Sequence, residues 1–234
     1  HIEKTAPGIV TVTMNHPPVN TLNQGLRDSL YQNLKQLNSD PRVKAIILTG
    51  EGEYFSAGAD ISEFKTGFKG ATLVQIQQQL ENSEKITIAA INGDALGGGL
   101  EIALACHFRV THATSKLILP EVTLGLIPGA GGTQRLPRLI GIEAALSMIV
   151  SGKAISGADA FQLGLVDYLT KESEGLIEKA QDYAKDLIAD GIQGIPTCEH
   201  NERLQTQMSR DELIASCQNE FDTIIQLHSV CFHI

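Results

Sequence analysis

Residues 93–101 (GDALGGGLE) contain a run of three glycines followed closely by the carboxyl group of Glu101, a pattern that could do chemistry. They lie where a buried strand at 86–91 is predicted to give way to a core helix at 100–106. Glycines at such a junction let a ligand come within hydrogen-bonding distance of the backbone. The free N–H groups of a helix's first turn suit a developing negative charge, and Glu101 adds a group that can move a proton. The segment predicts a site that stabilises an oxyanion while it exchanges protons.

Two further loops strengthen this prediction. Residues 55–61 (FSAGADI) follow an expected strand, and their small side chains would let a ligand approach the backbone, although a tight turn packed on the core is an equally good interpretation. Residues 119–134 place Glu121 among apolar neighbours and ahead of a second glycine cluster. A carboxyl group near an apolar wall tends to have a raised pKa, and two that face each other titrate as a coupled pair. Glu101 and Glu121 are the candidate proton carriers, while the alternative for either one alone is a structural carboxylate at a helix start.

Several other site types do not fit the sequence. Residues 129–134 (GAGGTQ) resemble a dinucleotide-binding G-x-G-x-x-G motif, but Gln134 replaces the last glycine. No Walker lysine follows either glycine cluster, and there is no Gly-x-Ser-x-Gly nucleophile motif. The seven histidines include no HExxH and no close pair, and the four cysteines lack metal-ligand spacing. We therefore assign no metal and expect the cysteines to be free thiols in a reducing compartment.

Composition excludes other classes of function. The 234 residues are 42% hydrophobic and 19% charged, as is ordinary for a soluble globular protein with one domain or one domain and an appendage. A net charge of −9 without any basic run disfavours nucleic-acid binding. No apolar run approaches the length that spans a bilayer. Because the chain begins at His1 and not at Met, we expect the native start to be missing. The sequence therefore does not exclude an N-terminal targeting peptide.

Alternating strands and helices must position the three loops. Their hydrophobic patterns predict an α/β fold with crossover connections. We expect strands at 8–14, 43–49, 86–91, 108–111 and 116–119, and helices at 22–37, 70–83, 100–106, 143–150, 156–163 and 174–189. The pattern weakens from Gly191, and 201–228 could form one or two helices. We divide the chain into a catalytic core at 1–190 and a C-terminal helical segment at 191–234.

The three loops together resemble the motifs of the crotonase (enoyl-CoA hydratase/isomerase) superfamily, over roughly residues 8–190. The resemblance rests on 56–61 (SAGADI), 95–101 (ALGGGLE), and Pro120-Glu121 leading into 127–136 (IPGAGGTQRL). Finer features look like the hydratase domain of peroxisomal bifunctional β-oxidation enzymes. These features are PPVN at 17–20, Cys106-His107, and PEVTLG at 120–125. The dehydrogenase domain of such an enzyme is not present in these residues.

The resemblance implies a crotonase-like spiral of ββα units with a helical C-terminal region, and a substrate held as a CoA thioester. It implies that the backbone N–H groups of Ala59 and Gly98 form an oxyanion hole for the thioester oxygen. Glu101 and Glu121 occupy the two catalytic glutamate positions of the family.

The same resemblance implies the binding residues. Ala57, Asp60 and Ile61 lie in the strip whose backbone meets the adenine end of CoA, and Gly129 is expected to help orient the water. No cofactor is required, because CoA is part of the substrate. Residues 196–234 do not clearly match the family's C-terminal segment, which closes the site and supports trimer contacts.

The favoured hypothesis is syn hydration of a trans-2-enoyl-CoA to a 3-hydroxyacyl-CoA in fatty-acid β-oxidation. Glu101 would deprotonate the water that attacks Cβ, and Glu121 would deliver a proton to Cα. The alternative is isomerisation of 3-enoyl-CoA to 2-enoyl-CoA, or both activities in one site. A non-catalytic acyl-CoA-binding or RNA-binding module is a third hypothesis, which the acidic balance and the presence of both glutamates disfavour.

The expected partners follow from the same hypotheses. They are an acyl-CoA substrate, no nucleic acid, no membrane span, a homo-oligomer as one option, and a dehydrogenase domain if the native chain is longer. The resemblance favours a peroxisomal location, with mitochondrial and cytoplasmic locations as alternatives. Acyl chain length is not evident from the sequence; we expect it to depend on Phe64, Phe68 and residues after Val74.

Overall fold

The computed structural model describes residues 1–171 and 175–219 of the chain, whose strands form two sheets. The larger sheet consists of β1 (Ile2–Ala6), β2 (Ile9–Met14), β3 (Ala45–Gly50), β5 (Ile86–Ile91), β7 (Phe108–His112) and β10 (Tyr168–Thr170), in that spatial order. The smaller sheet consists of β4 (Tyr54–Ser56), β6 (Asp94–Leu96), β8 (Lys116–Ile118) and β9 (Ile155–Ser156). In the larger sheet β1 is antiparallel to β2 and every other neighbouring pair is parallel.

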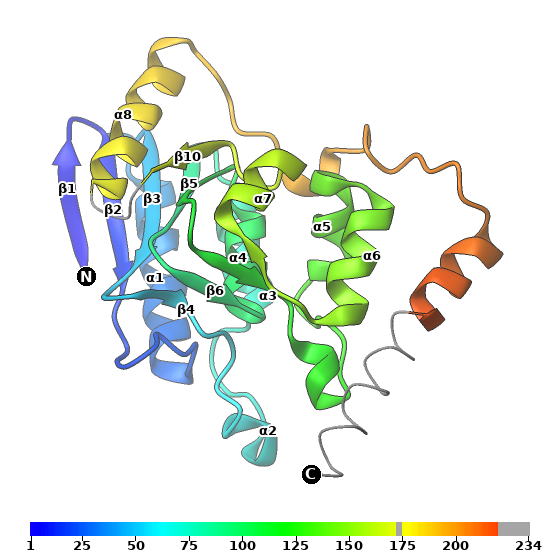
Figure 1. Ribbon diagram of the computed structural model, residues 1–234. Helices are drawn as coiled ribbons and strands as arrows, with labels where there is room; N and C mark the ends of the chain where they lie inside the picture. Colours follow the sequence, from blue (N-terminus) through cyan, green and yellow to red (C-terminus); the bar gives the residue numbers. More distant parts are fainter. Residues whose placement is uncertain (172–174, 220–234) are drawn as a thin grey trace.

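Helices cover both faces of the larger sheet (Figure 1). They are α1 (Gln24–Ser39), α2 (Glu63–Thr66), α3 (Leu73–Glu81), α4 (Gly98–Ala105), α5 (Gly132–Ile140), α6 (Ile142–Ser151), α7 (Gly157–Leu163) and α8 (Leu176–Ala189), with 3-10 turns η1 (Glu121–Leu124) and η2 (Thr197–Glu199). Residues 210–219 are also helical. Within the described ranges, no helix is both long and apolar enough for a membrane crossing.

A ββα unit recurs along the chain. Strands β3, β5 and β7 of the larger sheet are each followed within a few residues by β4, β6 and β8 of the smaller sheet, and then by helical structure. The two sheets come very close at these corners: a Cβ on Gly93 would collide with the carbonyl oxygen of Glu53. The arrangement confirms the predicted α/β fold of ββα units.

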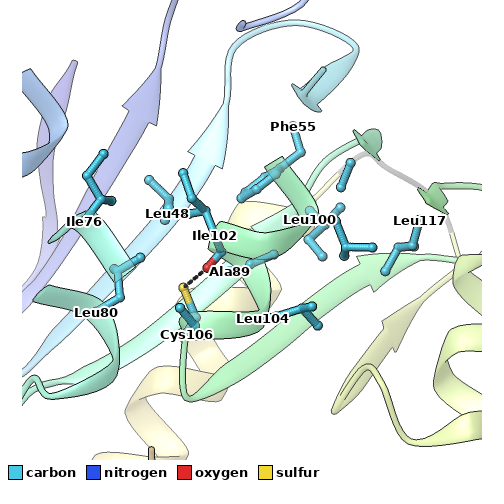
Figure 2. Packing of buried hydrophobic residues seen from close by; sticks show 14 of the residues in the cluster. Leu48, Phe55, Ile76, Leu80, Ala89, Leu100, Ile102, Leu104, Cys106 and Leu117 are labelled. Atoms are coloured by element: carbon cyan, nitrogen blue, oxygen red, sulfur yellow. Dashed lines mark hydrogen bonds between the residues drawn. The ribbon is translucent and has the colours of Figure 1, made fainter. Parts of the chain in front are cut away.

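The core explains why the central strands are almost entirely apolar. All six residues of β3 and of β5 are buried, as expected for parallel strands covered on both faces. Alternate residues face opposite sides: Ile46 and Leu48 join a cluster with α1, α3 and α4, whereas Ala45 and Ile47 pack with α8. Figure 2 shows part of the first cluster, which surrounds α4.

The predicted elements differ from the structure mainly where segments are short. The strand at 86–91 is confirmed residue for residue, and the predicted cap of α7 is confirmed because Ser156 Oγ accepts a hydrogen bond from the N–H of Asp159 at 3.1 Å. Strands β1, β4, β6, β9 and β10 were not predicted, and neither was α5, whose interior contains Pro137. Proline removes a backbone donor and disfavours a helix prediction. For residues 201–228 we expected one or two helices: residues 201–209 are not helical, residues 210–219 are helical, and 220–228 lie outside the described residues.

Candidate active site

A cavity of about 510 Å³ lies where the three predicted loops meet. This volume is within the range of small-molecule sites. Seven of the eight site residues predicted from the sequence line it: Ala57, Ala59, Ile61, Gly98, Glu101, Glu121 and Gly129. The loops belong to three successive ββα units, so the spiral brings together segments that are far apart in the chain.

Asp60 is the eighth predicted residue, and it does not line the cavity. Its carboxylate oxygen Oδ1 accepts a hydrogen bond from the N–H of Ser62 at 2.9 Å. Hydrogen bonding from the Ser62 side chain, together with this N–H bond, holds the pKa of Asp60 below its usual range. Its backbone oxygen accepts the N–H of Glu63 at 3.1 Å, so Asp60 shapes the turn that leads into α2.

The backbone N–H groups of Ala59 and Gly98 are both available in the cavity wall. The Gly58 carbonyl accepts the Leu22 N–H at 2.8 Å, and the Gly97 carbonyl accepts the Glu101 N–H at 2.9 Å. Because the N–H of a trans peptide points opposite to its carbonyl, the Ala59 and Gly98 N–H groups point away from these partners. Among the hydrogen bonds of residues 1–171 and 175–219, neither group is a donor.

The two amides also lie close to each other. A Cβ added to Gly98 would be 3.5 Å from the Ala59 nitrogen, and one added to Gly58 would be 3.1 Å from the Gly98 nitrogen. Gly58 has a φ of 86°, a backbone conformation that favours glycine. The geometry therefore offers one small volume into which two N–H groups can donate.

Glu101 is held firmly in the inner wall of the cavity. It is only 2% exposed, and its Oε1 accepts hydrogen bonds from the N–H groups of Ala130 and Gly132, both at 2.8 Å. Burial raises its pKa, which these two N–H groups and the Arg135 guanidinium partly oppose. Glu101 therefore has strong hydrogen-bond donors that favour its ionised form.

Glu121 has a different environment. It begins η1, and its Oε2 is buried with no hydrogen-bond partner among the described residues. Its pKa is raised to about 7, chiefly by burial and in smaller part by the negative charge of Glu101. Two carboxyl groups whose environments differ in this way can act as a base and an acid at the same pH.

Arg27 lines one side of the cavity. Its guanidinium donates to the carbonyls of Leu22 at 2.6 Å, Lys69 at 2.7 Å and Ala71 at 2.8 Å. It also forms an ion pair with Glu63 at 2.9 Å. The side chain is 2% exposed, and it joins the start of α1 to the loop between α2 and α3, which carries part of the cavity wall.

Replacing Arg27 by Met is expected to lower the free energy of unfolding by about 3–5 kcal/mol, because it leaves the buried Oε2 of Glu63 without its cation and three backbone carbonyls without the guanidinium donors. Urea denaturation measures this effect. The control is Arg42→Met, which removes an ion pair with Asp40 from a side chain that is 79% exposed and should cost about 0–1 kcal/mol. Equal losses in the two variants would show that Arg27 does not hold the loop.

Three contributors to this site were not predicted from the sequence. The Ala130 and Gly132 amides lie in the glycine cluster that was noted, but their bonds to Glu101 were not anticipated. Nothing in the sequence indicates that Arg27 is buried, since a lone arginine in an amphipathic helix is normally solvent-exposed. Phe68 lines the cavity as expected. Val74 lines it as well, but the residues of α3 that follow Val74, which we expected to contribute, do not. The side chain of Phe64 lies outside the described part of the structure.

Comparisons with known proteins agree with this arrangement. The family model described as Enoyl-CoA hydratase/isomerase matches residues 4–230. The chain is 46% identical over 184 residues to a probable enoyl-CoA hydratase of Bacillus subtilis, covering 75% of this chain and 71% of that protein. The crystal structure of an enoyl-CoA hydratase from Bacillus anthracis matches with a TM-score of 0.74 and 32% identity, covering 97% of this chain and 90% of that one. The crotonase-like fold is thereby confirmed.

Longer relatives match only in part. The chain is 47% identical over 165 residues to the peroxisomal bifunctional enzyme of Danio rerio, covering 70% of this chain. It spans 23% of the length of that relative.

Proposed function

We propose that this chain, which belongs to the enoyl-CoA hydratase/isomerase family, is an enzyme that adds water across a trans-2-enoyl-CoA to give a 3-hydroxyacyl-CoA, as in fatty-acid β-oxidation. One observation carries the proposal. A single cavity holds two backbone N–H groups that donate no hydrogen bond within the described residues, together with two carboxyl groups of different proton affinity. Hydration needs these parts together.

The proposed reaction uses each carboxyl group once. Glu101, as a carboxylate, takes a proton from water while the water oxygen bonds to Cβ. Glu121, as a carboxylic acid, gives its proton to Cα. The proton gained by Glu101 then returns to Glu121 through solvent, so the net change is the addition of one water molecule. Positioned acids and bases of this kind typically contribute about 10²- to 10⁴-fold in rate.

The Ala59 and Gly98 amides would stabilise the enolate that forms between these steps. Negative charge develops on the thioester oxygen when water attacks Cβ, and fixed donors need no reorganisation to meet it. A donor of this kind is typically worth about 3 kcal/mol of the barrier. Gly129, which lines the same cavity, is proposed to help orient the water.

Isomerisation of 3-enoyl-CoA to 2-enoyl-CoA is the second candidate. The pKa of Glu121 near 7 suits a group that both takes and gives a proton at neutral pH. Such a shuttle between C4 and C2 needs one carboxyl group only. One site with both glutamates could therefore catalyse both reactions.

The cavity wall supports an acyl-CoA substrate. Apolar side chains of Leu73, Val74, Leu124 and Ile127 line it and suit an acyl chain. Ala57 and Ile61 lie at the cavity in positions proposed to meet the adenine end of CoA, with Asp60 shaping the adjoining turn. We propose that no cofactor is needed, since CoA is part of the substrate.

The wider context is also a proposal. The bifunctional relatives support a longer native chain that includes a dehydrogenase domain, and a peroxisomal location. Residues 1–190 are proposed as the catalytic core because all the cavity residues lie within them, and 191–234 as a C-terminal segment. A homo-oligomer and the absence of nucleic-acid partners remain part of this proposal.

A panel of enoyl-CoA substrates of different chain lengths, assayed for both water addition and double-bond migration, tests the proposed function. We expect hydration of crotonyl-CoA or a longer homologue. Rapid isomerisation without hydration would make the isomerase the correct assignment. Absence of both reactions would refute the enzyme hypothesis.

Replacing Gly98 by Ala tests the oxyanion hole. The added methyl group would lie 2.8 Å from Leu73 Cδ1 and 3.5 Å from the Ala59 nitrogen, and so would occupy the space between the two amides. We expect kcat/KM for hydration to fall by about 10²- to 10³-fold, the effect of losing one oxyanion donor. The control is Gly25→Ala on the exposed side of α1, whose methyl group would meet nothing closer than Asn23 Oδ1 at 3.7 Å. Activity of Gly98→Ala equal to that of the control would argue against the hole.

A further inference from the structure

We propose that Arg135 and Glu81, an ion pair behind the cavity wall, are positioning residues that hold the Glu101 carboxylate in place and keep it ionised. This inference rests on the proposed hydratase function. Neither residue lines the cavity, so both would act through Glu101 rather than on the substrate.

The ion pair is buried and has two hydrogen bonds. Arg135 Nη2 donates to Glu81 Oε2 at 2.6 Å, and Arg135 Nε donates to Glu81 Oε1 at 3.1 Å. The two side chains are 12% and 7% exposed. Paired donors of this kind fix the orientation of a guanidinium as well as its position.

Arg135 contacts the loop that holds Glu101. Its Nη1 donates to the carbonyl of Ala130 at 3.2 Å, and the N–H groups of Ala130 and Gly132 bind the Glu101 carboxylate. The guanidinium is packed so closely against this loop that a Cβ on Gly131, whose φ is 93°, would collide with Nη1. The position of Arg135 therefore determines where the two N–H donors point.

A second connection reaches the backbone of Glu101 itself. Gln77 Nε2 donates to the Glu101 carbonyl at 3.1 Å, and Arg135 Nη1 donates to Gln77 Oε1 at 3.4 Å. Glu81 Oε1 also accepts the N–H of Cys198 at 3.1 Å. The ion pair thus joins α3, α4, α5 and η2 around one catalytic carboxyl group.

The charge of Arg135 acts in the same direction as the geometry. The charged groups nearest Glu101 are Arg135 on α5, which is paired with Glu81 on α3, and Glu121 on η1, whose pKa the charge of Glu101 raises. Arg135 is the cation among them, and its charge lowers the pKa of Glu101 against the effect of burial. Without it, Glu101 would ionise at a higher pH and bind the two N–H groups less firmly.

The test replaces the pair as a unit, Glu81→Gln with Arg135→Gln, so that no unpaired charge remains buried. Because a misplacement of about 1 Å can cost 10²-fold in rate, we expect kcat for hydration to fall by about 10- to 100-fold. The acidic limb of the pH profile of kcat/KM should move to higher pH.

A second variant, Arg135→Lys, keeps the cation but not the paired donors. It should lower kcat and leave the acidic limb near its wild-type position. The control is Arg138→Gln, on the same helix, which loses bonds to the Gln134 and Cys198 carbonyls.

A titration that does not depend on turnover separates this inference from the proposed function. The carboxyl ¹³C resonance of Glu101, assigned by its loss in Glu101→Gln, should titrate at higher pH in the double variant than in wild type and Arg138→Gln. An unchanged midpoint together with an unchanged pH profile would overturn the inference. If the wild type hydrates no enoyl-CoA but the midpoint shifts as expected, the proposed function fails while the positioning role stands. If the double variant does not fold, Arg135→Lys with full wild-type kcat would overturn the inference.

Discussion

Replacing Glu121 by Gln is expected to lower kcat for hydration of crotonyl-CoA by about 10²- to 10⁴-fold, the usual contribution of a positioned acid. The amide keeps the size of the carboxyl group but has no acidic proton for Cα. The control is Glu178→Gln, the same change on an exposed residue of α8. Hydration at the wild-type rate in Glu121→Gln would remove this residue from the mechanism.

The same substitution should change how stability depends on pH. The folded-state pKa of Glu121 is about 7, above the ordinary value of 4.5, so folding favours its protonated form. The protonated Glu121 side chain therefore contributes to the free energy of unfolding. This contribution is fully present below about pH 4.5 and is lost as the pH rises through about 7. Glu121→Gln has no such loss, and we expect its thermal stability to exceed that of the wild type at pH 8 but not at pH 4.5. Equal pH dependence in both proteins would contradict the burial of an unpartnered Oε2.

Replacing Glu101 by Gln is the second large effect. The amide oxygen can still accept the hydrogen bonds of Ala130 and Gly132, so the fold and the loop should persist. The amide cannot take a proton from water, and hydration should fall by about 10²- to 10⁴-fold. Isomerisation of a 3-enoyl-CoA should fall much less, because Glu121 alone can shuttle the proton.

Parallel assays of the two reactions on Glu101→Gln and wild type measure this contrast. Equal losses in both would mean that Glu101 also takes part in proton shuttling, and the division of roles would be wrong. In the wild type, kcat/KM should fall at low pH as Glu101 gains a proton and at high pH, above about 7, as Glu121 loses its own. Because the two groups interact, the two limbs belong to the pair.

Much of the candidate site could be predicted from local sequence because it consists of short motifs. Glycines at 97–99 and at 58 are needed where the backbone itself must be exposed to a ligand, and this need is visible in the residue types. The long strands and the amphipathic helix α1 were predictable for a similar reason, since their hydrophobic periodicity extends over several residues. Strands of two or three residues, such as β6 and β9, are too short to have a period.

The sequence by itself determined the α/β class, the identity of the two glutamates and the loops that would carry the amides. Only the tertiary structure decided that the Ala59 and Gly98 N–H groups converge. It also decided that Glu101 accepts hydrogen bonds from two amides while Glu121 Oε2 has no partner among the described residues. The burial of Arg27 and Arg135 was likewise decided there. The physical reason is that each of these properties depends on pairs of residues far apart in the chain. Proton affinity, burial and hydrogen-bond direction are set by neighbours in space, and a residue's neighbours in sequence do not specify them.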